Sequence, residues 1–341
     1  MIDWLSACIP LPRHWHDRDW DAICGATVFL APGGTVERIV PRWLEVKGSF
    51  DAALRVRVGT RGLYLSGNPT KALTGQNLDG PESAAWLLSR VANVCTAALG
   101  LPNVLSIVSS RFSRVDVTRS YDVGSVERVR EIVRIAGITG RAKRQGGATI
   151  SHTTVYWGQH SRRHSVKMYC KADELRTHPP SIPIASVCSS IQAAAGPLLR
   201  VELTLRGKQL EEDGTQEARF WLGPSLADHY FERYWPMIQI SDGVALMPEE
   251  VAALPRTLRR TYELWLRGGD CAELLSNGSR YRHRAAILAA TGGSVDIFVL
   301  RPSSVAPDLA RECLGSYLRS LEPWKSEGRL SEWIEQTAGA A

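Results

Sequence analysis

The chain has 341 residues, which is long enough for two domains of about 100 to 200 residues each. A composition of 44% hydrophobic and 22% charged residues is typical of folded globular proteins and excludes a disordered, collagen-like or coiled-coil chain. The formal net charge of +6 suits a polyanionic partner. The seven cysteines are scattered with no C-x-x-C pair, which argues against a disulfide framework or a zinc site and favours a reducing cytoplasm.

The amino-terminal segment does not resemble a targeting signal. It lacks the basic and long apolar regions of a signal peptide, and no apolar run reaches the about 18 residues that a membrane span needs. We therefore expect a cytoplasmic protein that is neither secreted nor membrane-spanning.

The first half of the chain predicts short strands, one clear helix and a second helix. The helix over residues 83–99 has Ser83 as its N-cap and ends at Gly100. A further helix is expected near residues 125–135. Strands separated by Gly-rich turns are predicted over 2–9, 26–30, 54–58, 63–66 and 111–118.

The second half predicts a β-hairpin and then a helical region. The hairpin strands are 153–157 and 163–171, joined by a polar turn, and they are followed by a loop over 175–185, a helix near 186–195 and a strand over 199–206. Amphipathic, helix-like segments follow at 251–267, 271–276, 281–290 and 307–321. These elements predict an α+β fold, a central antiparallel sheet with flanking helices, in a domain over 1–214, followed by a mainly helical domain over 215–341 with a possible DNA-binding role.

Positive charge is concentrated in residues 111–171, where thirteen Lys and Arg face four acids, a local charge of +9 against −3 for the rest. Such a block suits the phosphate backbone of DNA, although a solvated basic surface would give the same pattern. The Gly-rich segment 141–147 is either a surface loop or an arm that grips phosphate. The candidate DNA contacts are Arg114, Arg141, Lys143, Arg144, Arg162, Arg163 and Lys167.

Three central strands each divide into an apolar and a polar face, because successive strand side chains point to opposite sides. The polar sets are Arg114, Asp116 and Thr118; Lys167, Tyr169 and Lys171; and Glu202, Thr204 and Arg206. If the three strands share one sheet, a single face collects Asp116, Glu202, Tyr169 and Lys171.

That group could carry out phosphoryl chemistry. The two carboxylates offer hard oxygen ligands for Mg²⁺ or Mn²⁺, and Tyr169 could attack phosphorus to form a phosphotyrosine. Lys171 could neutralise the developing charge, and Glu174 could contact the metal or Lys171, or cap the next turn. The competing interpretation is an ordinary solvent-facing antiparallel sheet.

Several blocks of this sequence resemble the phage and plasmid replication initiators of the filamentous-phage gene II/X family, which are related to the HUH rolling-circle nickases. The blocks occur in family order over most of residues 1–210. They are Met1-Ile2-Asp3, the segment 66–80, Ser113-Arg114-Val115-Asp116-Val117-Thr118, Thr154-Val155-Tyr156-Trp157 with Ser161-Arg162, Tyr169-x-Lys171-x-x-Glu174-Leu175, and Leu199-Arg200-Val201-Glu202.

The resemblance implies a rolling-circle-initiator-like fold and a site-specific, metal-dependent endonuclease in the cytoplasm of a bacterial host. It would nick one strand of a phage origin, stay bound to the 5′ phosphate through Tyr169, and later rejoin the displaced circle. Origin DNA, duplex and single-stranded, is the implied partner, and a host replication helicase and polymerase are possible further ones. No ATP-binding P-loop sequence is present, as expected if transesterification conserves the bond energy.

Some residues are alternative candidates for the site. Gln76 stands where family members often carry His, so it could bind a metal only through its amide oxygen. The sequence His14-Trp15-His16 spells the His-hydrophobe-His pattern but lies in an expected loop far from Tyr169. His152, His160 and His164 flank the hairpin and could each complete a metal shell, and Tyr156 is a competing nucleophile for which cross-strand packing is favoured. Trp157, Trp221 and Trp235 could stack on bases, but core packing is favoured.

Two other functions fit the same residues. A non-catalytic DNA-binding replication regulator would explain the basic block equally well and would be insensitive to loss of Asp116 or Glu202. A hydrolytic nuclease would use a metal-bound water, with Tyr169 only stacking. A covalent protein–DNA adduct distinguishes both from a nickase.

Overall fold

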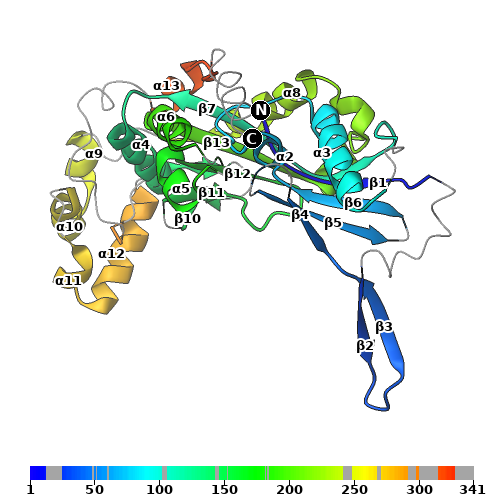
Figure 1. Cartoon of the computed structure of the whole chain (residues 1–341). Helices are drawn as coiled ribbons and strands as arrows, with labels where there is room; N and C mark the ends of the chain where they lie inside the picture. Colours follow the sequence, from blue (N-terminus) through cyan, green and yellow to red (C-terminus); the bar gives the residue numbers. More distant parts are fainter. Residues whose placement is uncertain are drawn as a thin grey trace.

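The structure is a computed structural model of the whole chain (Figure 1). It describes residues 1–12, 25–47, 50, 52–59, 61–101, 106–142, 146–151, 153–180, 182, 184–240, 248–266, 270–290, 297–298 and 314–326.

A nine-stranded sheet forms the centre of the molecule, with the strand order β10-β11-β12-β13-β7-β1-β6-β5-β4. Every neighbouring pair is antiparallel, which confirms the predicted sheet type. The strands are β1 (Ile2–Ile9), β4 (Leu44–Lys47), β5 (Ala53–Gly59), β6 (Gly62–Gly67), β7 (Arg111–Asp122), β10 (Thr149–Ser151), β11 (Thr154–Trp157), β12 (His164–Cys170) and β13 (Leu198–Arg206).

Helices flank the sheet, and two of them begin at a serine N-cap, of which the sequence predicts Ser83. The Ser83 hydroxyl accepts the Trp86 N–H at the start of α3, and the Ser125 hydroxyl accepts the Arg128 N–H at the start of α4. These helices are α2 (Pro69–Thr74), α3 (Ala84–Ala98), α4 (Val126–Thr139), α5 (Lys171–Thr177), α6 (Ala185–Ala195), α7 (Gly207–Glu212) and α8 (Ser225–Tyr234), with short 3-10 turns η2 (Ala218–Trp221) and η3 (Trp235–Met237).

One prediction about the second half was wrong. The strand expected over 163–171 ends at Cys170, and Lys171 is the first residue of α5, which also occupies the start of the expected loop. Cys170 has extended backbone angles and serves as the N-cap residue of this helix. The consequence is that Lys171 lies at a strand-to-helix junction immediately after the strand that carries Tyr169.

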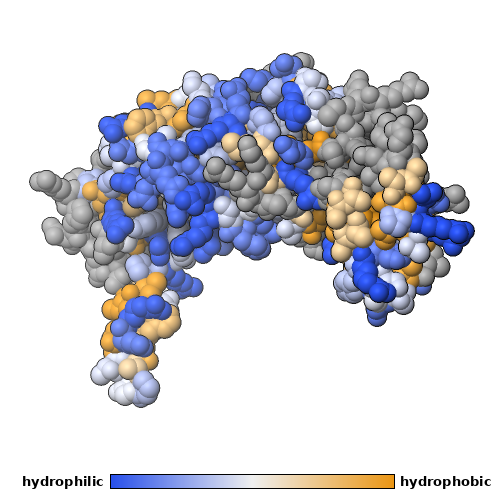
Figure 2. Space-filling view, turned by 180° about the vertical axis from the view of Figure 1, so that it is seen from behind, coloured by the Kyte–Doolittle hydropathy of each residue, from blue (hydrophilic) through white to orange (hydrophobic). Residues whose placement is uncertain are grey.

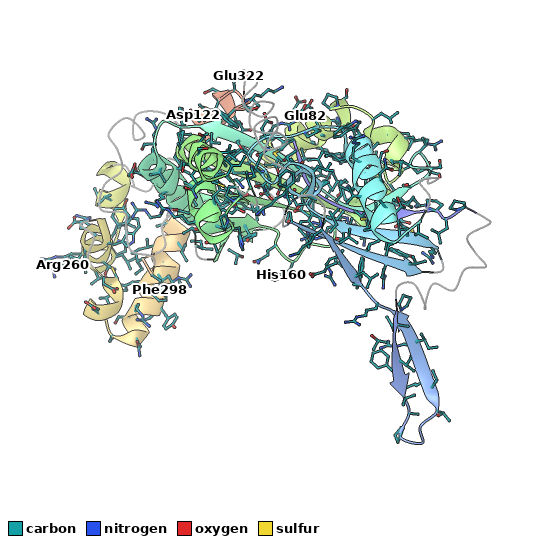
Figure 3. All side chains as sticks on the ribbon, in the orientation of Figure 1. Glu82, Asp122, His160, Arg260, Phe298 and Glu322 are labelled. Carbon is teal, nitrogen blue, oxygen red and sulfur yellow. The ribbon has the colours of Figure 1, made fainter. Side chains whose placement is uncertain are left out.

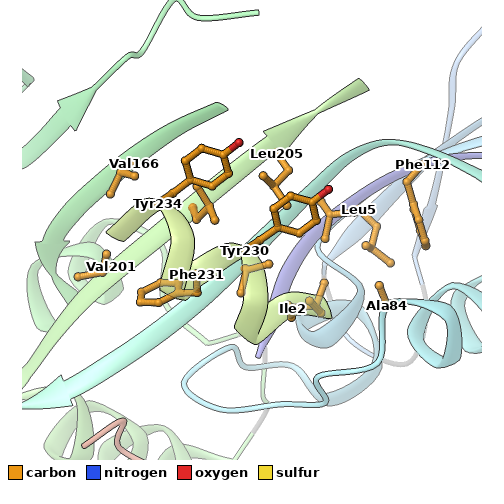
Figure 4. Close-up of a cluster of buried hydrophobic side chains, with 14 of the residues drawn as sticks. Ile2, Leu5, Ala84, Phe112, Val166, Val201, Leu205, Tyr230, Phe231 and Tyr234 are labelled. Carbon is orange, nitrogen blue, oxygen red and sulfur yellow. The ribbon is translucent and has the colours of Figure 1, made fainter. Parts of the chain in front are cut away.

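The apolar side of the sheet forms the main hydrophobic core. In Figure 4 the aromatic side chains of α8, among them Tyr230 and Tyr234, lie over aliphatic residues of the strands. Trp157 and Trp221 are fully buried and Trp235 is 7% exposed, so the core packing favoured for these three tryptophans is confirmed. The sheet therefore has one covered apolar face and one face free for polar residues.

The predicted division of the chain at residue 214 stays a prediction, but the packing adds detail. Residues 218–240 and α13 (Leu314–Ser320) contribute to the same core as the sheet. A separate small core joins Leu254, Tyr262, Trp265, Cys271, Ile287 and Ile297. It lies among α9 (Pro248–Ala253), α10 (Arg256–Leu266), α11 (Cys271–Leu274) and α12 (Asn277–Ala290), at one end of the molecule (Figure 1).

Two smaller sheets complete the fold. The strands β14 (Ile238–Gln239), β8 (Arg141–Ala142) and β9 (Gly146–Gly147) form one, and β2 (Ala26–Leu30) with β3 (Val36–Pro41) forms a two-stranded ribbon that projects from the body (Figure 1). The α+β architecture with carboxy-terminal helices agrees with the predicted fold class. Among the described helices, none has the length and apolar character required to cross a bilayer.

Candidate active site

The polar faces of three adjacent strands combine into one surface, as the alternation predicts. Lys167 on β12 lies opposite Glu202 on β13, and Thr204 on β13 lies opposite Asp116 on β7. Directly opposed residues share a face of an antiparallel sheet. Tyr169, two residues after Lys167, is therefore on the same side as both carboxylates.

Tyr169 is buried among polar groups rather than aliphatic ones. Its hydroxyl donates a hydrogen bond to Glu202 Oε1, and its side chain is only 4% exposed. The Lys167 ammonium lies 5.2 Å from the centre of the Tyr169 ring and 2.7 Å from Glu202 Oε2. Burial, followed by the negative charge of Glu202, holds the pKa of Tyr169 well above its usual range, so the hydroxyl keeps its proton at neutral pH.

The two predicted carboxylate ligands have different surroundings. Burial raises the pKa of Glu202 despite the nearby Lys167 charge, which makes this carboxylate a better proton acceptor than an exposed one. Asp116 is held by Arg114 through two hydrogen bonds, from Nε at 2.8 Å and from a terminal nitrogen at 2.5 Å.

Lys171 is fully buried beside the tyrosine strand. Its ammonium donates to Asn77 Oδ1 at 2.8 Å and to Glu174 Oε2 at 2.6 Å. Burial and the repulsion of Arg200 lower the pKa of Lys171 to about 8. Glu174 therefore partners Lys171, one of the roles that the sequence left open for it.

Four further residues line this polar cluster and were missed as site candidates. Asp3 Oδ1 accepts hydrogen bonds from Asn68 and Asn77, both at 2.9 Å, and from Arg200 at 3.2 Å. Fully buried Arg200 also donates to the backbone carbonyl of Asn77 and lies 3.7 Å from Glu202 Oε1. Burial would raise the pKa of Asp3, but Arg200 and other nearby cations lower it.

Part of this omission was avoidable. Arg200 precedes Glu202 by two residues on β13, so the alternation used for Glu202 also places Arg200 on the polar face. Asp3 lies where β1 shifts register between Ile2 and Trp4, and such an irregularity breaks the simple alternation.

The donor chemistry of the site suits Mg²⁺ or Mn²⁺, since carboxylate oxygens are what these ions prefer. Each acid nevertheless has a basic partner: Arg114 for Asp116, Lys167 for Glu202, Lys171 for Glu174 and Arg200 for Asp3. Within the described ranges, no three His, Cys, Asp or Glu side chains are grouped so as to hold a metal. For Asp116 and Glu202 to hold an ion together, Arg114 and Lys167 would have to move away from them.

The other candidate ligands lie elsewhere or have other partners. The Gln76 amide oxygen accepts the Leu78 N–H at 2.6 Å, so the atom that could bind a metal instead holds a turn. His164 stacks on Tyr234 on the apolar side of β12, with ring centres 3.9 Å apart, and burial lowers its pKa. His160 is exposed in the hairpin turn (Figure 3). The predictions on His14, His16 and His152 fall outside the described residues.

Many of the basic residues that the sequence offers as DNA contacts form ion pairs with acids that are distant in the sequence. Arg114, Lys167 and Arg163 each pair with an acid, Arg163 with Glu212 through two hydrogen bonds. At least six of the thirteen basic residues in 111–171 have an acidic partner, and most of these acids lie outside that segment. Arg162 is exposed in the hairpin turn, Arg141 is half-buried on β8, and Lys143 and Arg144 are outside the described residues.

Tyr156 lies on β11 opposite Lys167, so it shares the face of Tyr169. The described contacts do not give it a carboxylate partner like the one that Glu202 provides to Tyr169. Of the two hydroxyls, Tyr169 is therefore the one whose described contacts include a carboxylate that could accept its proton.

Comparisons with known proteins agree with the motif order. The chain is 29% identical over 302 residues to a replication-associated protein of Enterobacteria phage I2-2, covering 84% of this chain and 86% of that protein. A rolling circle replication initiator protein from Geobacillus stearothermophilus aligns over 71% of this chain and 86% of its own, but a TM-score of 0.33 and 14% identity carry no weight for fold or function. The family defined by the amino-terminal region of the phage replication-associated protein matches residues 1–223, and the chain belongs to this family.

Proposed function

We propose that this protein nicks one strand of a phage replication origin through Tyr169 and later rejoins the ends. Membership of the phage replication-associated protein family supports a role in rolling-circle phage replication. The observation that carries the catalytic proposal is the hydrogen bond from the Tyr169 hydroxyl to Glu202, a buried acid with a raised pKa.

This contact indicates where the tyrosine proton goes when Tyr169 attacks the phosphate. Because the pKa of Tyr169 is far above neutrality, the phenol needs a base at the moment of attack, and Glu202 is the bonded acceptor. The Tyr169 oxygen forms a bond to phosphorus as the bond from phosphorus to the 3′ oxygen breaks. The leaving 3′ oxygen takes up one proton, which balances the proton that Glu202 accepts from the tyrosine. The reverse attack by a 3′ hydroxyl restores the phosphodiester and the free tyrosine.

Positive side chains around the tyrosine supply charge to the reaction. Lys171 is a buried cation two residues after Tyr169 in the sequence, and in the proposal it offsets the negative charge that accumulates on the phosphoryl oxygens. Lys167 lies 5.2 Å from the centre of the Tyr169 ring and is a second cation close to the proposed nucleophile.

A divalent cation is part of the proposal. Asp116 and Glu202 would hold it, and when bound it would polarise the scissile phosphate as a Lewis acid. We expect Mn²⁺ to raise the melting temperature of the wild-type protein, because a ligand that binds only the folded state stabilises it. Asp116→Asn should abolish that shift in a thermal-denaturation titration, whereas exposed Asp122→Asn should keep it. An equal Mn²⁺ response in Asp116→Asn and wild type would contradict the assignment.

The covalent intermediate gives the direct test of the nucleophile. Incubation of the protein with Mn²⁺ and supercoiled origin plasmid should give open circles that carry protein on the new 5′ end. Tyr169→Phe should remove both products while DNA binding in a gel-shift assay persists, and Tyr156→Phe should keep both. Nicking without a covalent adduct would indicate a water nucleophile, and binding without any nicking would indicate a non-catalytic regulator.

A further inference from the structure

The β2–β3 ribbon has a surface that the catalytic site does not explain. It is a sheet of only two strands, and it points away from helices α3 and α8, which lie on the apolar side of the main sheet (Figure 1). An isolated two-stranded hairpin is marginally stable in water, so a partner that covers it would stabilise it.

One face of this ribbon is entirely apolar. Val28 pairs with Ile39, and Leu30 pairs with Val36, so these four side chains share a face. They are 48%, 52%, 59% and 58% exposed, respectively. The tip between the strands is Ala31-Pro32-Gly33-Gly34-Thr35, and Pro32 is exposed there.

The base of the ribbon is basic. Residues 25–61 contain six basic side chains against three acids, Glu37, Glu45 and Asp51. Three of them lie beside aromatic rings: Arg38 is 4.4 Å from the Phe29 ring centre, and Arg55 and Arg57 are 5.1 and 4.7 Å from the Trp43 ring centre. One of the six, Arg38, lies opposite Phe29 next to the tip of the ribbon. The other five follow the ribbon in sequence and are Arg42, Lys47, Arg55, Arg57 and Arg61.

The base of the ribbon continues the sheet face that carries Tyr169. Arg55 lies opposite Ser66, Ser66 opposite Ser6, and Ser6 opposite Arg114, so these residues share the polar face with Asp116. Five strand spacings separate β12 from β5, which is about 24 Å, or about 7 base pairs of duplex. The ribbon itself adds about 20 Å of reach for its six-residue strand.

We infer that the β2–β3 ribbon is a DNA-distorting arm that enters the minor groove of the duplex flanking the nick site. The positively charged residues where the ribbon joins the main sheet contact phosphates, and the apolar tip inserts between base pairs. Proteins that insert Pro, Leu or other apolar side chains between base steps in this way unstack and kink the duplex. The charge of the base favours DNA over a second copy of this chain, because two such basic regions would repel each other.

The arm deepens the proposed function, on which its biological role rests. Tyr169 needs an unpaired strand to reach the scissile phosphate, and unstacking a few base pairs away lowers the cost of melting it. The arm would therefore couple duplex recognition to exposure of the strand that is cut.

Fluorescence on an uncut duplex tests the arm independently of catalysis. The probe is an A·T-rich duplex of about 30 base pairs with a dye at each end and central 2-aminopurine, mixed at low salt with the Tyr169→Phe protein. We expect energy transfer between the ends and 2-aminopurine emission both to rise. Adding Leu30→Ser and Val36→Ser should remove both signals while changing the apparent Kd less than about threefold, because phosphate contacts supply most of the affinity.

Leu222→Ser is the matched control, since Leu222 is 68% exposed and lies elsewhere in the chain. It should keep both signals. Arg42→Ala and Arg55→Ala should each lower the slope of log K against log salt by about 1, as expected for the loss of one phosphate contact.

Three results would overturn the arm: unchanged signals in the Leu30→Ser, Val36→Ser protein, loss of the signals in Leu222→Ser as well, or a dimer in sedimentation that the ribbon substitutions convert to a monomer. The two proposals fail separately. Covalent nicking by wild type without DNA distortion rejects the arm alone, and distortion without a covalent adduct rejects the Tyr169 nucleophile alone.

Discussion

At the scale of single residues, the site is a compensated cluster of charges. The acids Asp3, Asp116, Glu174 and Glu202 each contact a basic side chain, so burial of the cluster does not leave an isolated charge. The cluster holds Tyr169 protonated while keeping a proton acceptor in contact with it. A phosphate that enters must compete for the same cations.

The lowered pKa of Lys171 predicts a pH dependence of nicking. Burial lowers the pKa of Lys171 from the usual value of 10.5 to about 8. The side chain is therefore mostly charged below pH 8 and mostly neutral above it. If the charge of Lys171 acts in catalysis, the nicking rate should fall about tenfold per pH unit above pH 8. Single-turnover rates between pH 6 and 10 would show this limb. A fall at acidic pH would belong to protonation of Glu202, the proposed base, whose pKa is raised.

Lys171→Arg provides the comparison, because arginine keeps its charge across the whole range. Its rate should be lower overall, since the guanidinium cannot fit the contacts with Asn77 and Glu174 equally well, but the alkaline fall should vanish. An alkaline fall at the same pH in Lys171→Arg would assign the titration to another group.

At the scale of elements, the strands were predictable because each half-buried antiparallel strand carries its own alternating pattern. Asp116, Glu202 and Tyr169 follow from that pattern and from the shared sheet. Asp3 does not, because the register shift near Trp4 breaks the alternation. The sequence also did not show that many basic residues of the segment 111–171 are paired with acids, because the partners are distant. Arg119, for example, pairs with Asp228, which is 109 residues away and on a helix.

The turn after α2 gives a prediction at this scale. Gly75 ends the helix with a φ of 74°, and a Cβ there would lie 2.6 Å from Ile182 Cγ1 and 2.8 Å from Phe50 Cδ1. Gly100 has a similar φ of 64° but no atom within 4 Å of a built Cβ. Gly100→Ala should therefore lower the free energy of unfolding by only about 1 to 2 kcal/mol, which is the cost of placing an alanine in the left-handed backbone region. Gly75→Ala should cost at least about 1 kcal/mol more, because the side chain also clashes.

Urea denaturation of both variants measures that difference in the free energy of unfolding. Gly75→Ala should also slow nicking, because the turn that it distorts leads directly to Gln76 and Asn77, and Asn77 holds Lys171. Equal destabilisation by the two substitutions would show that Phe50 and Ile182 move aside freely.

At the scale of the whole molecule, the polar sheet face spans the region between two projections. Figure 2 shows the ribbon at one side and the carboxy-terminal helices at the other, with hydrophilic residues along much of the span between them. Arg260 on α10 is directed outward at the helical end (Figure 3). A long ligand that contacted both projections would therefore run along the hydrophilic surface between them.

The helical end should unfold on its own, because its hydrophobic cluster shares no residue with the core of the sheet. Trp265 and Tyr262 are fully buried in that cluster, and Trp265→Ala should remove about 3 to 5 kcal/mol of its stability. Hydrogen exchange should then accelerate in α10 and α12 while β7 and β13 keep their protection and covalent nicking persists.

Trp221→Ala, a matched truncation in the sheet core, should instead accelerate exchange in β7 and α8, since Trp221 contacts Phe112 and Tyr230 there. Faster exchange in β13 of Trp265→Ala would mean that the two cores unfold as one cooperative unit.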